Sequence, residues 1–139
     1  MVSALVVANK IIELCNEKQE GSITHLKLQK LLYFVQDAYF KKYGELLFDT
    51  PMHAWNYGPV EIGLYKLFSL YKDHPIPTDN VYQISTDALN DKQIEIIKNI
   101  VDESAKKDPW ELVKKTQKPG DRWDFAKNTK GLGCIISFI

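Results

Sequence analysis

A chain of 139 residues, 45% hydrophobic and 26% charged, is long enough for one domain with a hydrophobic core and too short for two. Eighteen basic residues balance eighteen acidic ones, and Arg122 is the only arginine. DNA-binding proteins draw most of their affinity from basic side chains, and bidentate base contacts favour arginine, so direct nucleic-acid binding is disfavoured. The composition therefore indicates one soluble domain over residues 1–139.

Cysteine usage and the first residues bear on where the protein acts. Cys15 and Cys134 lie near opposite ends of the chain in apolar surroundings. We expect both thiols to be reduced and at least partly buried, with a disulfide as the lesser alternative. The first ten residues lack a basic leader and predict a helix rather than a signal peptide, and no apolar run approaches the length that spans a bilayer. A cytoplasmic protein without a membrane anchor is expected.

Helical periodicity predicts the first two elements. A helix over about residues 2–17 would end at Gly21 and Ser22. Its apolar face would consist of Leu5, Ala8, Ile12 and Cys15. A second helix is expected over about residues 24–43, where the opening threonine can cap the first turn and Gly44 can adopt the left-handed conformation behind the last.

The second helix has the clearest pattern in the chain. Its apolar stripe consists of Leu28, Leu31, Leu32, Val35, Ala38 and Tyr39. The polar residues that fall largely outside this stripe are Lys27, Lys30, Gln36 and Lys41. Further aromatic residues, among them Phe40 and Tyr43, widen the apolar arc. A helix that is apolar over so wide an arc is buried on two sides or meets a partner.

A change of direction is expected at Gly58-Pro59. Helical periodicity disappears over residues 45–55, and the alternation over residues 52–55 suits a short strand or an extended turn. Gly58 can take backbone angles closed to other residues, and Pro59 suits the first turn of a helix. We therefore expect a third helix directly behind them, with one apolar face formed by Val60, Leu64, Leu67, Phe68 and Tyr71.

The remaining elements are predicted from caps and breaks. Residues 81–85 are expected to form a brief strand that pairs with the earlier extended piece. Asn90 and the glutamine three positions later have the spacing of a capping box, and Asp108-Pro109 is typical of the start of a short helix. A helical turn at 123–127 and an apolar end at 134–139, either a closing strand or a partner-facing tail, would follow. Together these elements predict a mainly α, compact single domain of about five to six helices with a small β element.

No pattern in the sequence is typical of catalysis. His25, His53 and His74 lack the spacing with another histidine or a cysteine that metal ligands on one element usually have. The seven glycines are scattered at breaks, and no Gly-x-Ser-x-Gly elbow is present. A small hydrolase or metal enzyme would have to assemble its residues from separated positions. We therefore expect no enzymatic activity, no cofactor and no metal.

Protein binding is the function class that the aromatic residues favour. The candidate contact residues are Phe40, Tyr43, Trp55, Tyr57, Tyr65, Trp110 and Trp123. Trp and Tyr dominate interface hot spots, but the same rings can fill a small core or brace turns. Phe40 illustrates both readings, since it either anchors a partner at the surface end of its helix or packs under residues 45–55.

Three short segments carry an ordered set of residues: Leu28-Gln29-Lys30-Leu31-Leu32-Tyr33, Leu47-Phe48-Asp49 and Ala54-Trp55-Asn56-Tyr57-Gly58-Pro59-Val60. This order resembles the Panacea antitoxin domain, the family of SocA-like proteins found in phage-related genes and bacterial toxin–antitoxin pairs. The structural motif residues of the resemblance are Leu28, Leu31, Leu32, Gly58 and Pro59. In a later segment the family commonly shows Thr-His, whereas Thr116 is followed here by Gln117, which can replace one hydrogen bond in a structural role.

The resemblance implies a protein that binds a toxin encoded by an adjacent gene and blocks its action without chemistry of its own. The toxins of this family are varied and include translation inhibitors, alarmone-synthetase-like enzymes among them, and membrane-active proteins. Two alternatives remain: an adaptor that delivers the toxin to a protease, and a phage-associated regulatory protein. A nucleic-acid-binding regulator would need a basic face that this composition hardly provides.

Overall fold

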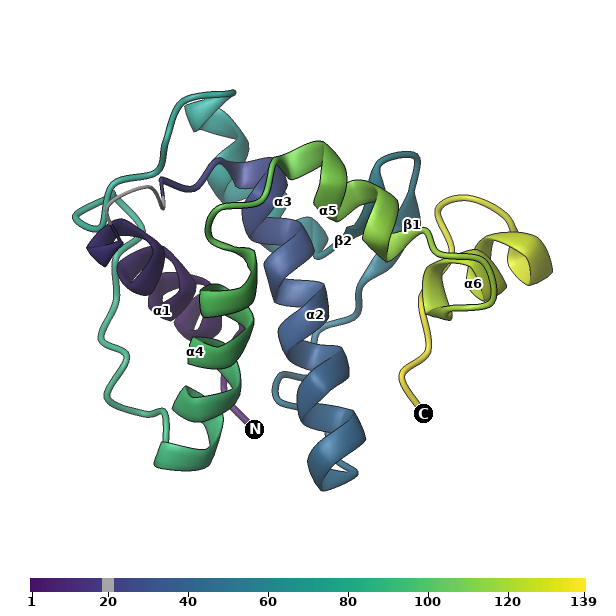
Figure 1. Ribbon diagram of the computed structural model, residues 1–139, viewed down its shortest axis with the longest axis horizontal. Helices are drawn as coiled ribbons and strands as arrows, with labels where there is room; N and C mark the ends of the chain where they lie inside the picture. The colour runs from purple at the N-terminus through teal and green to yellow at the C-terminus, as the bar shows by residue number, and fades with distance from the viewer. Residues whose placement is uncertain (19–21) are drawn as a thin grey trace.

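Six α-helices and one β-hairpin make up the part of the chain that the computed structural model describes, residues 1–18 and 22–139 (Figure 1). In chain order the elements are α1 (Ala4–Glu17), α2 (His25–Tyr43), β1 (His53–Trp55), β2 (Gly58–Val60), α3 (Ile62–Phe68), the 3-10 turn η1 (Ser69–Tyr71), α4 (Asp91–Ser104), α5 (Pro109–Thr116) and α6 (Arg122–Lys130). The expected mainly α fold with a small β element is confirmed. Gly21, expected to end the first helix, lies outside the described residues. None of the described helices combines the length and apolarity needed to cross a membrane.

Helix α2 is the centre of the fold. It contacts α1 and α4 on one side and α5 and β2 on the other, as Figure 1 shows. The Thr24 side chain caps its start by accepting a hydrogen bond from the N–H of Lys27, and Gly44 ends it with a left-handed φ of 71°. The predicted apolar stripe is buried apart from Ala38, which is half-buried. The stripe therefore supplies much of the hydrophobic core.

The polar residues of α2 are placed differently from the sequence-based expectation. Lys27, Lys30 and Gln36 were expected largely outside the apolar stripe, but all three are buried, whereas Lys41 is exposed as expected. The reason is that a neighbouring segment covers α2 at each of these three positions, and its main-chain groups need hydrogen-bond partners. Lys27 Nζ, for example, donates to the carbonyl of Ala105 behind α4.

Gly58 and Pro59 belong to strand β2 and not to the first turn of a helix, which corrects the sequence-based prediction. The hairpin pairs Trp55 with Gly58, so its turn has only two residues. Pro59 lies opposite Ala54, between two hydrogen-bonded pairs, where a strand residue needs no N–H. The missing donor of proline is therefore harmless in this hairpin.

Helix α3 begins later than predicted because its cap lies beyond the hairpin. The Glu61 carboxylate accepts hydrogen bonds from the N–H groups of Gly63 at 2.9 Å and Leu64 at 3.0 Å. Val60, predicted on the helix, is a buried strand residue instead, while Leu64 and Phe68 are buried as expected. A side-chain cap at position 61 thus sets the boundary between strand and helix.

The strand predicted at residues 81–85 does not form, and the C-terminal segment takes its place beside β1. The N–H of Ala54 donates to the carbonyl of Cys134 at 2.8 Å. Ile136 and Phe138 are buried in the core. The closing strand expected for the apolar end does not form as a full strand, because the segment makes only an isolated bridge between Ile135 and His53.

The remaining helix starts agree with the predictions. Asn90 and Gln93 form the capping box, with 2.9 Å between each side-chain oxygen and the partner's N–H nitrogen. Asp108 caps α5 by accepting a hydrogen bond from the N–H of Trp110, and Pro109 occupies the first turn. Helix α6 is longer at both ends than the expected turn.

Both cysteines are free thiols, as expected. Cys15 is buried in α1, and Cys134 is half-buried. Burial raises the pKa of the Cys15 thiol to about 11. Because the thiolate is the reactive form, this side chain acts as an inert part of the core at neutral pH.

Candidate protein-binding groove

Two glutamine side chains of α2 hold the main chain of neighbouring segments. Gln29 Nε2 donates to the carbonyl of Glu61 at 3.1 Å, and the N–H of Glu61 donates to Gln29 Oε1 at 2.8 Å. Gln36 binds the segment before the hairpin in the same way, accepting from Leu47 N–H at 2.8 Å and donating to the carbonyl of Phe48 at 2.7 Å. All four bonds are buried, so losing one leaves an unpaired peptide group inside the protein.

The hairpin is also held by α6 and by the residue that ends α5. The indole Nε1 of Trp123 donates to the carbonyl of Trp55 at 3.0 Å. Gln117 Nε2 donates to the carbonyl of Asn56 at 2.7 Å. Gln117, for which a structural hydrogen bond was expected, therefore ties the end of α5 to the hairpin turn.

Lys30 connects α2 to strand β2 from within the core, where its side chain is 0% exposed. Its Nζ donates to the carbonyl of Pro59 at 2.9 Å, and its aliphatic part lies beneath Gly58. None of the ion pairs between described residues includes Lys30. Burial lowers the pKa of Lys30 from 10.5 to about 7.

We expect the free energy of unfolding to increase as the pH rises from about 7 towards 10.5, because Lys30 has a lowered pKa in the folded protein. The Lys30→Met variant should lack this part of the pH dependence. In that window the unfolded chain holds a proton on Lys30 that the folded chain has lost, so raising the pH favours folding by about 1 kcal/mol per pH unit. Urea unfolding of both proteins at several pH values between 7 and 9 measures the effect. Lys27, whose pKa burial also lowers, is present in both proteins and cancels. If the free energies of unfolding of the two proteins changed in parallel with pH, Lys30 would keep its charge in the folded protein.

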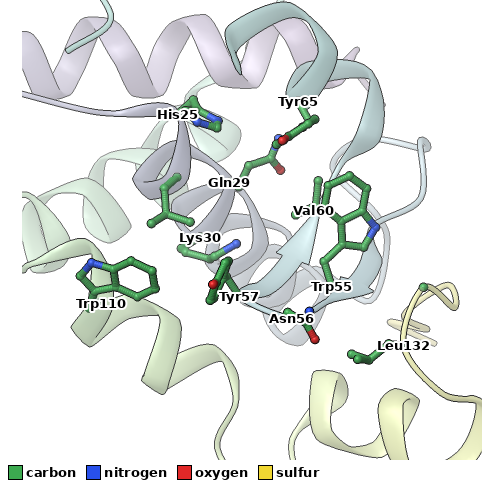
Figure 2. A pocket seen from close by; sticks show the side chains of 12 residues that line it. His25, Gln29, Lys30, Trp55, Asn56, Tyr57, Val60, Tyr65, Trp110 and Leu132 are labelled. Carbon is green, nitrogen blue, oxygen red and sulfur yellow. The ribbon is translucent and has the colours of Figure 1, made fainter. Parts of the chain in front are cut away.

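Beside this network the surface is hollowed into a cavity of about 620 Å³, which we name the aromatic groove. Its lining comes from α2, the hairpin, α3, α5 and the loop before the C-terminal segment (Figure 2). The lining residues are His25, Leu26, Gln29, Lys30, Trp55, Asn56, Tyr57, Val60, Tyr65, Trp110, Leu132 and Gly133. The volume falls in the range of sites that bind ligands or side chains of a partner.

Four aromatic rings form the walls of the groove in two pairs. Tyr57 and Trp110 meet edge to face with ring centroids 5.3 Å apart, and Trp55 and Tyr65 do so at 5.0 Å. Tyr57 is 60% and Trp110 52% exposed, so both keep a large apolar surface in contact with solvent. Because each ring braces another, their positions are set before a partner arrives.

The polar character of the groove comes from α2. Among the described residues, no Asp or Glu lines it. His25 contributes a buried Nδ1 without a hydrogen-bond partner, and its ring lies 5.6 Å from that of Tyr65. Burial, and to a smaller extent the nearby Lys30 charge, lower the pKa of His25. The imidazole is therefore neutral at pH 7.

The groove brings together four of the seven candidate contact residues, namely Trp55, Tyr57, Tyr65 and Trp110. Trp123 lies outside the groove and is only 6% exposed, because its indole packs against the hairpin and donates to the carbonyl of Trp55. Phe40 and Tyr43 are half-buried near the end of α2. The guanidinium of Arg122 lies 5.6 Å from the ring centre of Phe40, so α6 covers part of this side chain.

Sequence reasoning missed several residues of the groove. His25 and Gln29 are one helical turn apart on α2, so helical spacing could have placed them on one face. Leu132 and Gly133 reach the groove only because the C-terminal segment pairs with β1, which no local pattern reveals. The most exposed phenylalanine, Phe125 on α6 at 67%, was also overlooked, and it lies outside the groove.

The fold and the groove define a small helical domain in which a central helix holds a hairpin and an exposed aromatic surface. Among the described residues, no group of three or more His, Cys, Asp or Glu side chains is placed to hold a metal ion. The family model for the antitoxin SocA-like Panacea domain matches residues 28–124, which is most of the chain. The chain therefore belongs to the SocA-like Panacea family, whose antitoxin-like character suggests a role that is not enzymatic. No curated protein and no solved structure matches the chain significantly.

Proposed function

We propose that this protein is the antitoxin of a bacterial or phage toxin–antitoxin pair and neutralises its cognate toxin by direct binding. The observation that carries the proposal is the family match over residues 28–124. The partner is a protein toxin encoded by an adjacent gene, and the toxin class we favour is a translation inhibitor of the alarmone-synthetase type. The pair acts in the cytoplasm, without nucleic acid or membrane.

The division of tasks among the side chains supports binding as the mode of action. Gln29, Lys30 and Trp123, which lie inside the matched region, form hydrogen bonds to main-chain groups of the domain itself. These side chains serve the fold. The large exposed rings of Tyr57 and Trp110 are free of such tasks, and residues of this type dominate protein–protein hot spots.

Co-expression of the protein with the product of the adjacent gene is expected to yield a stable complex that contains an unmodified toxin. An antitoxin that acts by binding occupies its toxin at a constant ratio and leaves its covalent structure unchanged. Affinity purification through a tag on the toxin, followed by intact mass spectrometry, measures both properties. The control is the toxin expressed alone from a tightly repressed promoter.

Two results would speak against this function. A toxin whose mass has changed, recovered without a bound partner, would mean that the protein modifies it. A toxin that disappears from wild-type cells but accumulates in protease-deficient cells would identify the protein as an adaptor for proteolysis instead.

A further inference from the structure

We propose that the aromatic groove receives a segment of the toxin that presents a large apolar side chain flanked by carboxylates. This inference rests on the proposed antitoxin function and names the surface through which it operates. Two features of the groove carry the inference: its preordered rings and its charge.

The rings give the groove the properties of an interface anchor site. Tyr57 and Trp110 are the most exposed rings in the groove, and they contact each other edge to face. The turn that carries Tyr57 is held through its neighbour Asn56, whose carbonyl accepts the hydrogen bond from Gln117. Binding therefore costs little free energy for ordering this surface, and an apolar side chain placed against the exposed faces of the two rings displaces water from both.

The charge distribution selects a partner segment with acidic flanks. No Asp or Glu lines the described groove, and the Glu61 carboxylate nearby is engaged by the N–H groups that open α3. In and around α5, residues 106–118 carry five lysines against two acidic residues, Asp108 and Glu111, which are both exposed beside Trp110. On α5, the exposed Lys114 lies one helical turn beyond Trp110. Carboxylates beside the apolar anchor would face this basic region and speed association.

Among its described lining residues, the groove exposes no charged side chain. Lys30 is completely covered, so the groove offers a small charged ligand no exposed ammonium. The wide aromatic rims therefore favour a protein segment over a small molecule.

Biolayer interferometry with immobilised toxin from the adjacent gene tests the inference. Trp110→Ala and Tyr57→Ala should each weaken the affinity by roughly 30-fold or more, the effect of losing a hot-spot residue. Phe125→Ala removes an equally exposed ring outside the groove and should change the affinity by less than about 3-fold. Lys114→Glu should slow association at low salt, whereas Lys98→Glu on the exposed face of α4 should not. Because both rings are exposed, melting temperatures should stay within a few degrees of the wild type.

The outcomes separate the groove from the proposed function. If the wild-type protein binds the toxin and the groove variants bind it equally well, the groove is not the toxin-binding site, but the proposed function stands. A small molecule seen on the wild type by native mass spectrometry and lost in Trp110→Ala, without a change in toxin affinity, would also overturn it. A wild-type protein that does not bind the toxin would overturn both.

Discussion

Replacing Gly58 with alanine is expected to lower the free energy of unfolding by about 3–5 kcal/mol. The residue has a φ of 104°, which side chains rarely adopt. An added Cβ would lie 2.7 Å from Thr116 Oγ1 and 3.1 Å from Lys30 Cε. Both neighbours are buried, so they have little room to retreat without loosening the attachment of β2 to α2 and α5. Urea unfolding of the two purified proteins measures the difference.

Gly44→Ala is the matched control for this experiment. Gly44 also has a positive φ, 71°, but an added Cβ there meets nothing within 4 Å. Its replacement should cost only about 1 kcal/mol, the conformational part of the penalty. Adding Thr116→Ala to Gly58→Ala should recover part of the loss, because it removes the closest atom. Equal costs at positions 44 and 58 would show that close packing is not what position 58 requires.

Leu31→Ala is expected to lower the free energy of unfolding by about 2–4 kcal/mol, since it opens a cavity in the middle of the core. Leu31 is completely buried on the central helix, and its neighbours in the stripe, Leu28 and Val35, are equally buried. The same truncation at Leu70, a leucine of η1 that is mostly exposed, should cost less than about 0.5 kcal/mol. Thermal and urea unfolding would contradict the central role of α2 if the two variants were equally stable.

Local patterns were sufficient to predict the helices. The apolar stripe and the Gly44 cap indicated α2, and the spacing of Asn90 and Gln93 indicated the start of α4, because each of these signals is made within one or two helical turns. Four of the aromatic candidates, from the hairpin, α3 and α5, lie in one groove, while their role in binding stays a prediction.

The errors arose where a distant contact decides the local structure. Pro59 has the properties of a helix start, but the pairing with β1 makes it a strand residue. Lys30 would be a surface lysine by composition, yet it is buried because it binds the Pro59 carbonyl across 29 positions of the chain. The pairing of β1 with the C-terminal segment likewise joins parts of the chain that no window of sequence contains.

These contacts also separate the residues that hold the fold from those at the exposed rim of the groove. The residues that hold the hairpin, such as Gln29 and Trp123, are buried and constrained by the domain itself. The exposed rings at the rim of the groove, Tyr57 and Trp110, carry few such constraints. Substitutions at the rim are therefore expected to leave the core intact.

Calorimetric titration of the purified toxin with this protein tests direct neutralisation most directly. Binding predicts saturation at a small whole-number ratio, an unmodified toxin at the end of the titration, and a much weaker interaction for Trp110→Ala. A titration in which a small fraction of one equivalent inactivates all of the toxin, or in which no heat of binding appears while the toxin is still neutralised, would contradict direct binding.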